Sequence, residues 1–167
     1  MKRNIMTLLI TVFAMLQATA QTYDNLWKQA DIIAQKDQPK SEIGVMKKII
    51  SKATVAKDYG QLLAAEIRQA ILWREISPDS LTPNVKRMET EALKAKDPVL
   101  KAVRYAVLGK VYREVNGKKS EEFFKKALEQ PELLARNAST GYVPLTLKGV
   151  DGSSFNNDLL HLIGFEA

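Results

Sequence analysis

The feature that most constrains the fold is a series of segments in which apolar residues recur at spacings of three and four. This spacing places the apolar side chains on one face of an α-helix. Proline, glycine and short polar residues separate the segments, as is typical of helix ends. Helices are therefore expected over 23–35, 41–57, 62–76, 82–96 and 99–115, and from Ser120, as the capping residue, past Leu128.

The last two of these segments carry a repeat signature. Tyr105-x-x-Leu108-Gly109-x-x-Tyr112 is followed by Phe124-x-x-Ala127-Leu128-x-x-Pro131, which resembles the tetratricopeptide pattern. Small residues at Gly109 and Ala127 would let two antiparallel helices approach closely, with Tyr112 and Phe124 filling the crease. The sequence predicts an all-α fold of about three antiparallel hairpins stacked as a short tetratricopeptide-like solenoid. The alternative is an ordinary helical bundle without repeat geometry.

The first 20 residues have the three parts of a signal peptide. Lys2-Arg3 form a positive start, 5–16 is apolar, and Ala18-Thr19-Ala20 offers the small residues that signal peptidase requires. Cleavage is expected after Ala20, which predicts a protein of the periplasm or cell envelope. The apolar run is short for a bilayer span, so no membrane span is expected after cleavage.

Residue chemistry gives no sign of catalysis. The chain has no cysteine, and His161 is its single histidine, so no catalytic residue, metal site or cofactor site is predicted. The paired carboxylates Glu121-Glu122 and Glu89/Glu91 are expected on helices rich in lysine, and we interpret them as solvated helix faces. We therefore expect neither enzyme activity nor a small-molecule substrate. The alternative, a small envelope enzyme, would need a cluster of polar side chains on the concave surface of the solenoid.

The charge also argues against nucleic acid. Removing Lys2 and Arg3 with the signal peptide leaves 23 basic residues against 19 acidic ones, from the 25 and 19 of the whole chain. These charges are interspersed, and no aromatic residues interleave with the basic ones as a base-stacking surface would require.

The character of the chain changes after residue 136. An irregular linker or short β segment is expected over 137–154, followed by a closing helix from about Asn156. The domain prediction is thus a signal peptide at 1–20, a helical-repeat domain at 21–136, and a linker plus final helix at 137–167. Apolar residues of that helix would need a following helix to cover them, which favours a truncated longer protein; alternatively, the helix folds back onto the solenoid. These residues are Leu159, Leu160, Leu162, Ile163 and Phe165.

Four stretches in this order resemble the N-terminal region of the large exported alpha-2-macroglobulin family proteins of Bacteroidetes. They are 23–28 (YDNLWK), 36–40 (KDQPK), 76–81 (ISPDSL) and 155–161 (FNNDLLH). The resemblance implies a helical front module that precedes macroglobulin β-sandwich domains in a protein that traps or inhibits proteases. None of that later machinery is present here, so no bait or thioester residue can be assigned. Asp79-Ser80-Leu81 also resembles the O-glycosylation sequon of that lineage, which makes Ser80 a candidate modification site.

The function expected from these observations is a non-catalytic exported module with a structural or protein-binding role. Its partner would be another protein or the remainder of a longer macroglobulin-type chain. The alternative is a free-standing periplasmic adaptor of the tetratricopeptide type.

Overall fold

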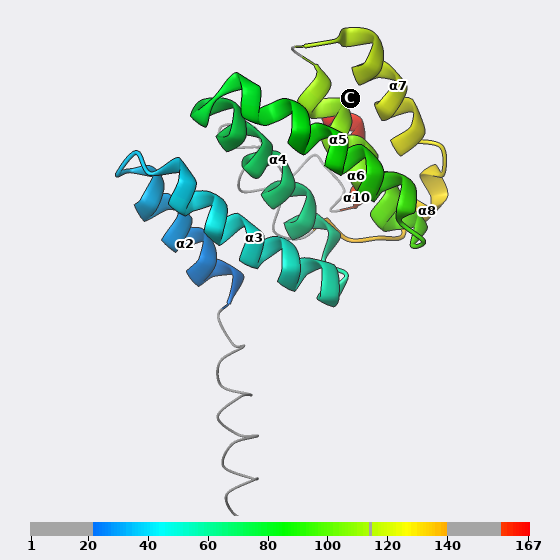
Figure 1. Cartoon of the computed structure of the whole chain (residues 1–167). Helices are drawn as coiled ribbons and strands as arrows, with labels where there is room; N and C mark the ends of the chain where they lie inside the picture. The colour runs from blue at the N-terminus through cyan, green and yellow to red at the C-terminus, as the bar shows by residue number, and fades with distance from the viewer. Residues whose placement is uncertain (1–21, 114, 140–157) are drawn as a thin grey trace, which may run out of the picture.

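The computed structural model describes residues 22–113, 115–139 and 158–167, and the regular structure in these ranges is all helical (Figure 1). Three hairpins follow one another: α2 (Tyr23–Ala34) with α3 (Pro39–Ala56), α4 (Tyr59–Ile76) with α5 (Pro78–Lys94), and α6 (Pro98–Tyr112) with α7 (Gly117–Ala127). Two shorter helices complete the described chain, α8 (Pro131–Ala135) and α10 (Leu159–Glu166). The predicted all-α stack of helical hairpins is confirmed.

The hairpins stack through their neighbouring helices. Helix α3 packs on both α2 and α4, α4 also packs on α5 and α6, and α6 packs on α5 and α7. Helices α4 and α6 therefore each pack on their own hairpin partner and on the preceding hairpin, whereas the first hairpin contacts the second through α3. This contact order is the one expected of a helical-repeat stack.

Helix starts differ most from the sequence expectation at α5 and α7. Asn116, not Ser120, caps α7, because its side chain accepts a hydrogen bond from the Lys119 amide at 3.1 Å. The breaker beginning at Ser77 is the cap and first turn of α5: Ser77 Oγ accepts from the Asp79 amide at 3.2 Å, and proline occupies the first helical position. A second proline, Pro83, lies inside α5.

The Asn116-Gly117 pair suggests in the sequence a helix that ends in a left-handed residue, but in the structure the pair begins α7. Gly117 is the first residue of α7, and among the residues that the structure describes the left-handed positions outside glycine are Asp37 (φ 52°) and Lys57 (φ 56°). Lys57 is the C-terminal cap of α3, so this helix end uses the conformation that glycine usually supplies.

The crease between α6 and α7 is close-packed at Gly109, as the repeat pattern predicts. A Cβ atom at Gly109 would lie 2.7–2.8 Å from three atoms of the Phe124 ring. The Ser120 hydroxyl donates a hydrogen bond to the Gly109 carbonyl oxygen at 2.8 Å, which ties the two helices together at the same level. Tyr112 stacks on Phe123 rather than on Phe124, with ring centroids 5.6 Å apart.

Helix α4 forms the centre of the core. Its residues were expected to bury one stripe, but most positions from Tyr59 to Trp73 are buried. The cause is its position, since α3, α5 and α6 all pack against it. A helix covered on several sides does not need the two-faced pattern of a surface helix.

Asp97 links the second and third hairpins. Its Oδ1 accepts hydrogen bonds from the amides of Val99 and Leu100 at 3.0 and 3.1 Å, which caps α6. Its Oδ2 accepts from the Tyr59 hydroxyl at 2.8 Å and lies 3.3 Å from Lys57 Nζ. Burial alone would raise the pKa of Asp97, but these hydrogen bonds outweigh it and lower the pKa.

A charged residue is buried where α4, α5 and α6 meet. Glu66 is 7% exposed, and its carboxylate lies 3.7 Å from Arg104 Nε. Arg104 in turn donates to the Glu91 carbonyl oxygen at 3.0 Å. Burial raises the pKa of Glu66 to about 7, although the charge of Arg104 acts in the opposite direction.

Helix α10 folds back onto the stack, which is the alternative to the expected exposed end. It packs on α8 and α6, and Leu159, Leu162 and Ile163 are buried, whereas Leu160 is partly buried and Phe165 is 49% exposed. Asp158 caps it by accepting a hydrogen bond from the His161 amide at 2.9 Å. The buried side chains of α10 therefore give no argument for a further helix that covers them.

Most of the linker segment lies outside the described residues. Residues 140–157 lie outside the described residues. The predicted signal peptide at 1–20 and its cleavage site after Ala20 lie outside them too. The described ends of the segment meet in an isolated antiparallel bridge between Ala138 and Asp158.

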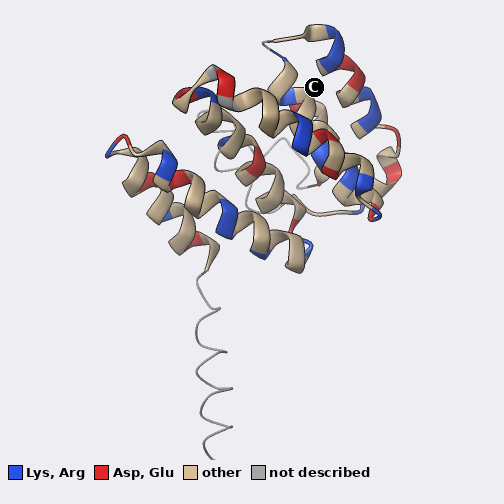
Figure 2. Cartoon of the chain, in the orientation of Figure 1, with Lys and Arg blue, Asp and Glu red and all other residues tan. Residues whose placement is uncertain are grey.

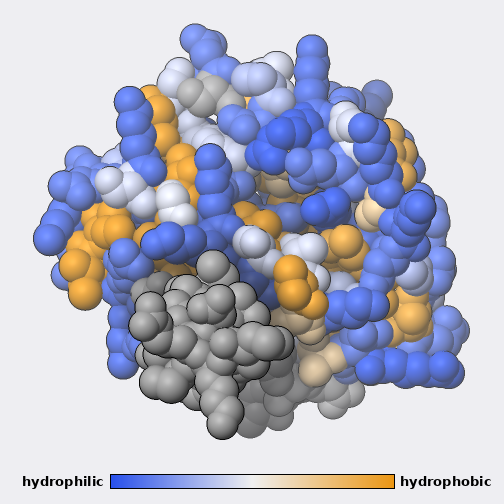
Figure 3. All heavy atoms as spheres, turned by 60° about the horizontal axis from the view of Figure 1, so that its bottom comes forward, coloured by the Kyte–Doolittle hydropathy of each residue, from blue (hydrophilic) through white to orange (hydrophobic). Residues whose placement is uncertain are grey.

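The described surface is mixed in character. Lysine and arginine residues alternate with aspartate and glutamate along the helices (Figure 2). On the face in Figure 3, apolar side chains form small patches separated by hydrophilic ones. Among the described helices, none is long and apolar enough to cross a bilayer.

Candidate binding groove

A hollow of about 300 Å³ lies along the first helices of the three hairpins, and we name it the groove. Helix α4 supplies its centre, α2 one side, and α3, α6 and α10 its remaining contacts. It is lined by Trp27, Ala30, Asp31, Glu42, Ala64, Ile67, Arg68, Ile71, Lys110 and Glu166. The two alanines leave room in the floor, and the isoleucines make it apolar. The groove is thus a property of the stack, because no single hairpin contains it.

Two ion pairs form the polar part of the groove. Arg68 Nε donates to Glu42 Oε1 at 2.7 Å, and Lys110 Nζ pairs with the Glu166 carboxylate. In both pairs the carboxylate is buried, with 3% and 4% of its side chain exposed, while the cations are 41% and 35% exposed. The groove therefore presents cationic N–H donors whose partner carboxylates lie beneath them.

The charge state of Arg68 follows from its surroundings. The hydrogen bond to Glu42 raises the pKa of Arg68, burial acts to lower it, and the charges of Glu42, Glu75 and Asp31 raise it further. Arg68 therefore remains a cation at any physiological pH. Asp31, an exposed residue of α2, adds a carboxylate to the rim.

The α2 side of the groove is fixed by a hydrogen bond to α4. Trp27 Nε1 donates to Gln61 Oε1 at 2.6 Å, and Gln61 is buried. Because a buried amide oxygen is costly to leave unpaired, this bond holds the Trp27 ring in place. The groove is consequently formed before any ligand arrives.

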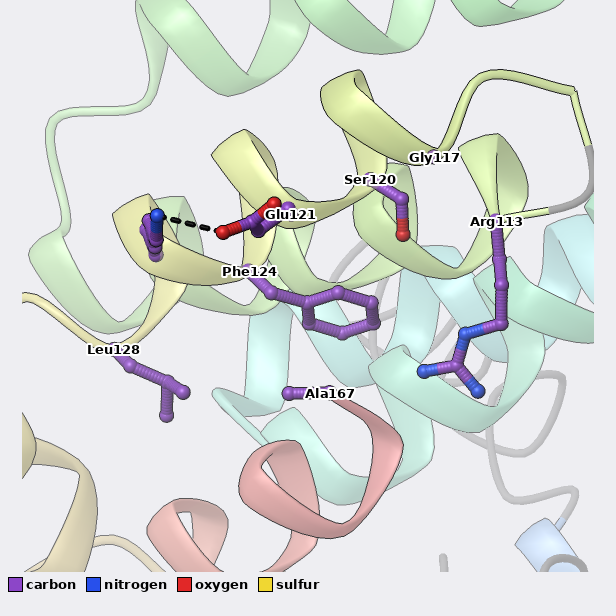
Figure 4. Close-up of a pocket in the computed structure, with 8 residues that line it drawn as sticks. Arg113, Gly117, Ser120, Glu121, Phe124, Leu128 and Ala167 are labelled. Carbon is purple, nitrogen blue, oxygen red and sulfur yellow. Dashed lines mark ion pairs between the residues drawn. The ribbon is translucent and has the colours of Figure 1, made fainter.

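A second, more open hollow of about 560 Å³ lies where α7 meets the end of α10, and we name it the end pocket. Figure 4 shows its apolar floor, with the Phe124 ring between Leu128 and the Arg113 guanidinium and Ala167 beside the ring. Arg113 Cζ lies 5.3 Å from the Phe124 ring centroid, a cation–π contact. The dashed line in Figure 4 marks the ion pair between Glu121 and Lys125, at 2.7 Å.

His161, the single histidine, lines neither hollow. Ser80 belongs to the first turn of α5 instead of a loop between helices. His161 is exposed on α10, with Nδ1 2.9 Å from the Asp158 carboxylate that caps the helix.

Sequence reasoning did not identify the groove residues. Glu42 and Glu166 look like ordinary surface glutamates in the sequence, because nothing local shows that another helix will cover them. A partial signal existed in Ala64, Ile67 and Ile71, which share one side of α4 at helical spacing.

Comparison with models of protein families, with curated proteins and with solved structures finds no match to this chain.

Proposed function

We propose that this chain is an exported, non-catalytic helical-repeat module that binds a protein segment in the groove. The observation that carries the proposal is the position of the groove on the first helices of successive hairpins. Helical-repeat stacks offer extended concave surfaces of this kind, and partners bind along them. Binding sites also tend to be preformed, apolar hollows with a few placed polar groups.

The absence of a catalytic role is part of this proposal. The carboxylates of Glu42 and Glu166 are tied to cations and covered, so neither is placed to exchange a proton with a substrate. A protein partner suits the groove better than a reacting small molecule, because its walls present the cationic donors of Arg68 and Lys110 and the Asp31 carboxylate around an aliphatic floor.

Export is proposed from the sequence of residues 1–20. Amino-terminal sequencing of the protein isolated from the cell envelope should begin at Gln21. Retention of Met1, with the protein in the cytoplasm, would refute this part.

We further propose that the chain is related to the helical front region of alpha-2-macroglobulin-type proteins. Support comes from the four ordered stretches such as 23–28 and 155–161. The test is to sequence past codon 167 and to measure the product size in the envelope. Sequence for β-sandwich domains, with a product far above 18.7 kDa, would support the relation; unrelated sequence and a small product would contradict it.

The second candidate function is a free-standing adaptor of the tetratricopeptide type. It is favoured by α10, whose apolar residues Leu159, Leu162 and Ile163 are covered by the stack itself. Both candidates use the same groove, so they differ in the chain that carries the module and share its binding role.

The binding role is tested by recovering complexes from the envelope with three tagged forms of the protein. Ile71 is partly buried in the groove, and Ile71→Glu places a charge there without removing a core side chain. Lys48→Glu changes an exposed position of α3 and serves as the matched control. A partner held by the wild type and by Lys48→Glu, and lost with Ile71→Glu, supports the proposal; equal recovery by all three forms refutes it.

A further inference from the structure

We infer that the groove recognises the main chain of an extended, uncharged segment, with Arg68 and Lys110 donating hydrogen bonds to its carbonyl oxygens. This inference rests on the proposed function and names the class of partner. It follows from the donors that the groove exposes, from its net charge and from its size.

The exposed polar groups on the α4 and α6 side of the groove are donors. Arg68 uses Nε for Glu42, which leaves the N–H groups of its two terminal nitrogens directed away from that bond. Lys110 has three N–H donors and gives one to Glu166. Since the paired carboxylates are buried beneath the cations, a ligand here meets N–H groups and must supply oxygen acceptors.

The net charge decides between a carboxylate and a carbonyl oxygen as that acceptor. Glu42, Glu166 and Asp31 carry three negative charges, against the two positive charges of Arg68 and Lys110. The groove is therefore slightly negative overall, which disfavours an acidic segment. The main chain of a peptide complements groove charges of both signs. Its carbonyl oxygens face the cations, while its N–H groups can reach the Asp31 carboxylate.

Hydrogen-bonding capacity decides between an extended segment and a helix. The carbonyl oxygens of an α-helix accept hydrogen bonds from its own amides, whereas an extended segment leaves them available to Arg68 and Lys110. The hollow of about 300 Å³ suits a short extended segment. Two residues of extended chain fill roughly 300 Å³, from the strand rise, the strand spacing and the sheet spacing. Small or β-branched side chains would then lie against Ala64, Ile67 and Ile71.

The desolvation cost of the two buried carboxylates also supports a recognition role for the ion pairs. Burying a carboxylate under a cation contributes little net stability, because desolvation offsets the attraction. What the pairs do provide is a fixed position for each donor. Donors held in place lose less side-chain entropy when a ligand binds.

The probe is a random 12-residue display library, selected on the purified protein after depletion on the Ile71→Glu variant. Depletion removes peptides that bind elsewhere, including those in the end pocket. The enriched peptides should be uncharged, rich in valine, threonine and isoleucine, and without helical periodicity. Enrichment of acidic or helical peptides would overturn the inference while leaving the proposed function intact.

The strongest selected peptide then enters a fluorescence-anisotropy titration. The double variant Arg68→Gln/Glu42→Gln removes both members of one pair, so no buried charge is left behind. It should weaken binding roughly 2- to 13-fold, the range that corresponds to a lost hydrogen bond. Replacing the amides of the peptide by esters weakens its carbonyl acceptors. This replacement should lower the affinity for the wild type much more than the affinity for the double variant.

The outcomes separate the two proposals. Equal loss from ester replacement on both proteins means that Arg68 does not read the main chain, and overturns the inference alone. A library that yields no peptide dependent on Ile71 overturns the proposed binding function as well. Circular dichroism of each variant must match the wild type, and Lys48→Glu should bind every peptide with unchanged affinity.

Discussion

The close approach of α6 and α7 gives the sharpest prediction about the fold. Gly109→Ala should destabilise the protein, because the new Cβ would lie 2.7–2.8 Å from Cγ, Cδ2 and Cε2 of Phe124. Rotating the ring cannot relieve the contact with Cγ, which lies on the rotation axis. The helices would have to separate, and the Ser120–Gly109 hydrogen bond of 2.8 Å opposes this.

The expected magnitude comes from two opposing effects. Overpacking of a close-packed contact costs about 1–3 kcal/mol. Alanine is a better helix former than glycine by about 1 kcal/mol, which offsets part of this cost. With a contact this short we place the overpacking near the upper end, for a net loss of about 2 kcal/mol.

Gly44→Ala is the matched control. Gly44 lies inside α3, is exposed, and a Cβ there would meet nothing within 4 Å. The same substitution should therefore stabilise the protein by about 0.5–1 kcal/mol. Urea unfolding followed by far-ultraviolet circular dichroism measures both variants. Two variants of equal stability would refute the close approach, as would a Phe124→Leu change that fails to relieve the cost of Gly109→Ala in a double-mutant cycle.

Three further variants test the polar contacts between hairpins, each by urea unfolding. Asp97→Ala removes the cap of α6 and the acceptor for Tyr59, and should cost about 2 kcal/mol; a loss below half of that would contradict this assignment. Ser120→Ala should cost about 1–2 kcal/mol, because the Gly109 carbonyl loses its buried partner, whereas an unchanged midpoint would show that the bond contributes nothing. The pKa of Glu66 is raised from 4.5 to about 7, so the folded state binds a proton more tightly than the unfolded state. Stability should therefore fall as the pH rises from about 4.5 to about 7, and Glu66→Gln should flatten this fall; an identical pH dependence for the variant would contradict it.

The sequence was sufficient for the helices and their pairing. Apolar spacing and breakers located the helices, and the Gly109 and Phe124 pattern identified one hairpin contact correctly. These features are local or lie within one repeat, so periodicity and residue size reveal them. The helix starts at Ser77 and Asn116 were misplaced because several neighbouring polar residues could each serve as a cap.

The groove could not be predicted, because it depends on contacts between hairpins. Glu42 is buried only because α4 carries Arg68 to it, and Glu166 only because α10 returns to α6. The central position of α4 could not be predicted either, because its sequence looks like that of a helix with one apolar stripe. Tertiary packing determines which of the many charged residues become covered.

The most direct test of the central claim, that the groove holds a protein segment, is site-specific photocrosslinking in the cell envelope. A benzophenone amino acid replaces Ile71 in the groove or Leu128 in the end pocket, and the crosslinked peptides are identified by mass spectrometry. We predict a single partner segment crosslinked from position 71, extended and uncharged in sequence, and none from position 128. Crosslinks from position 128 alone, or the same scattered set from both positions, would contradict the account.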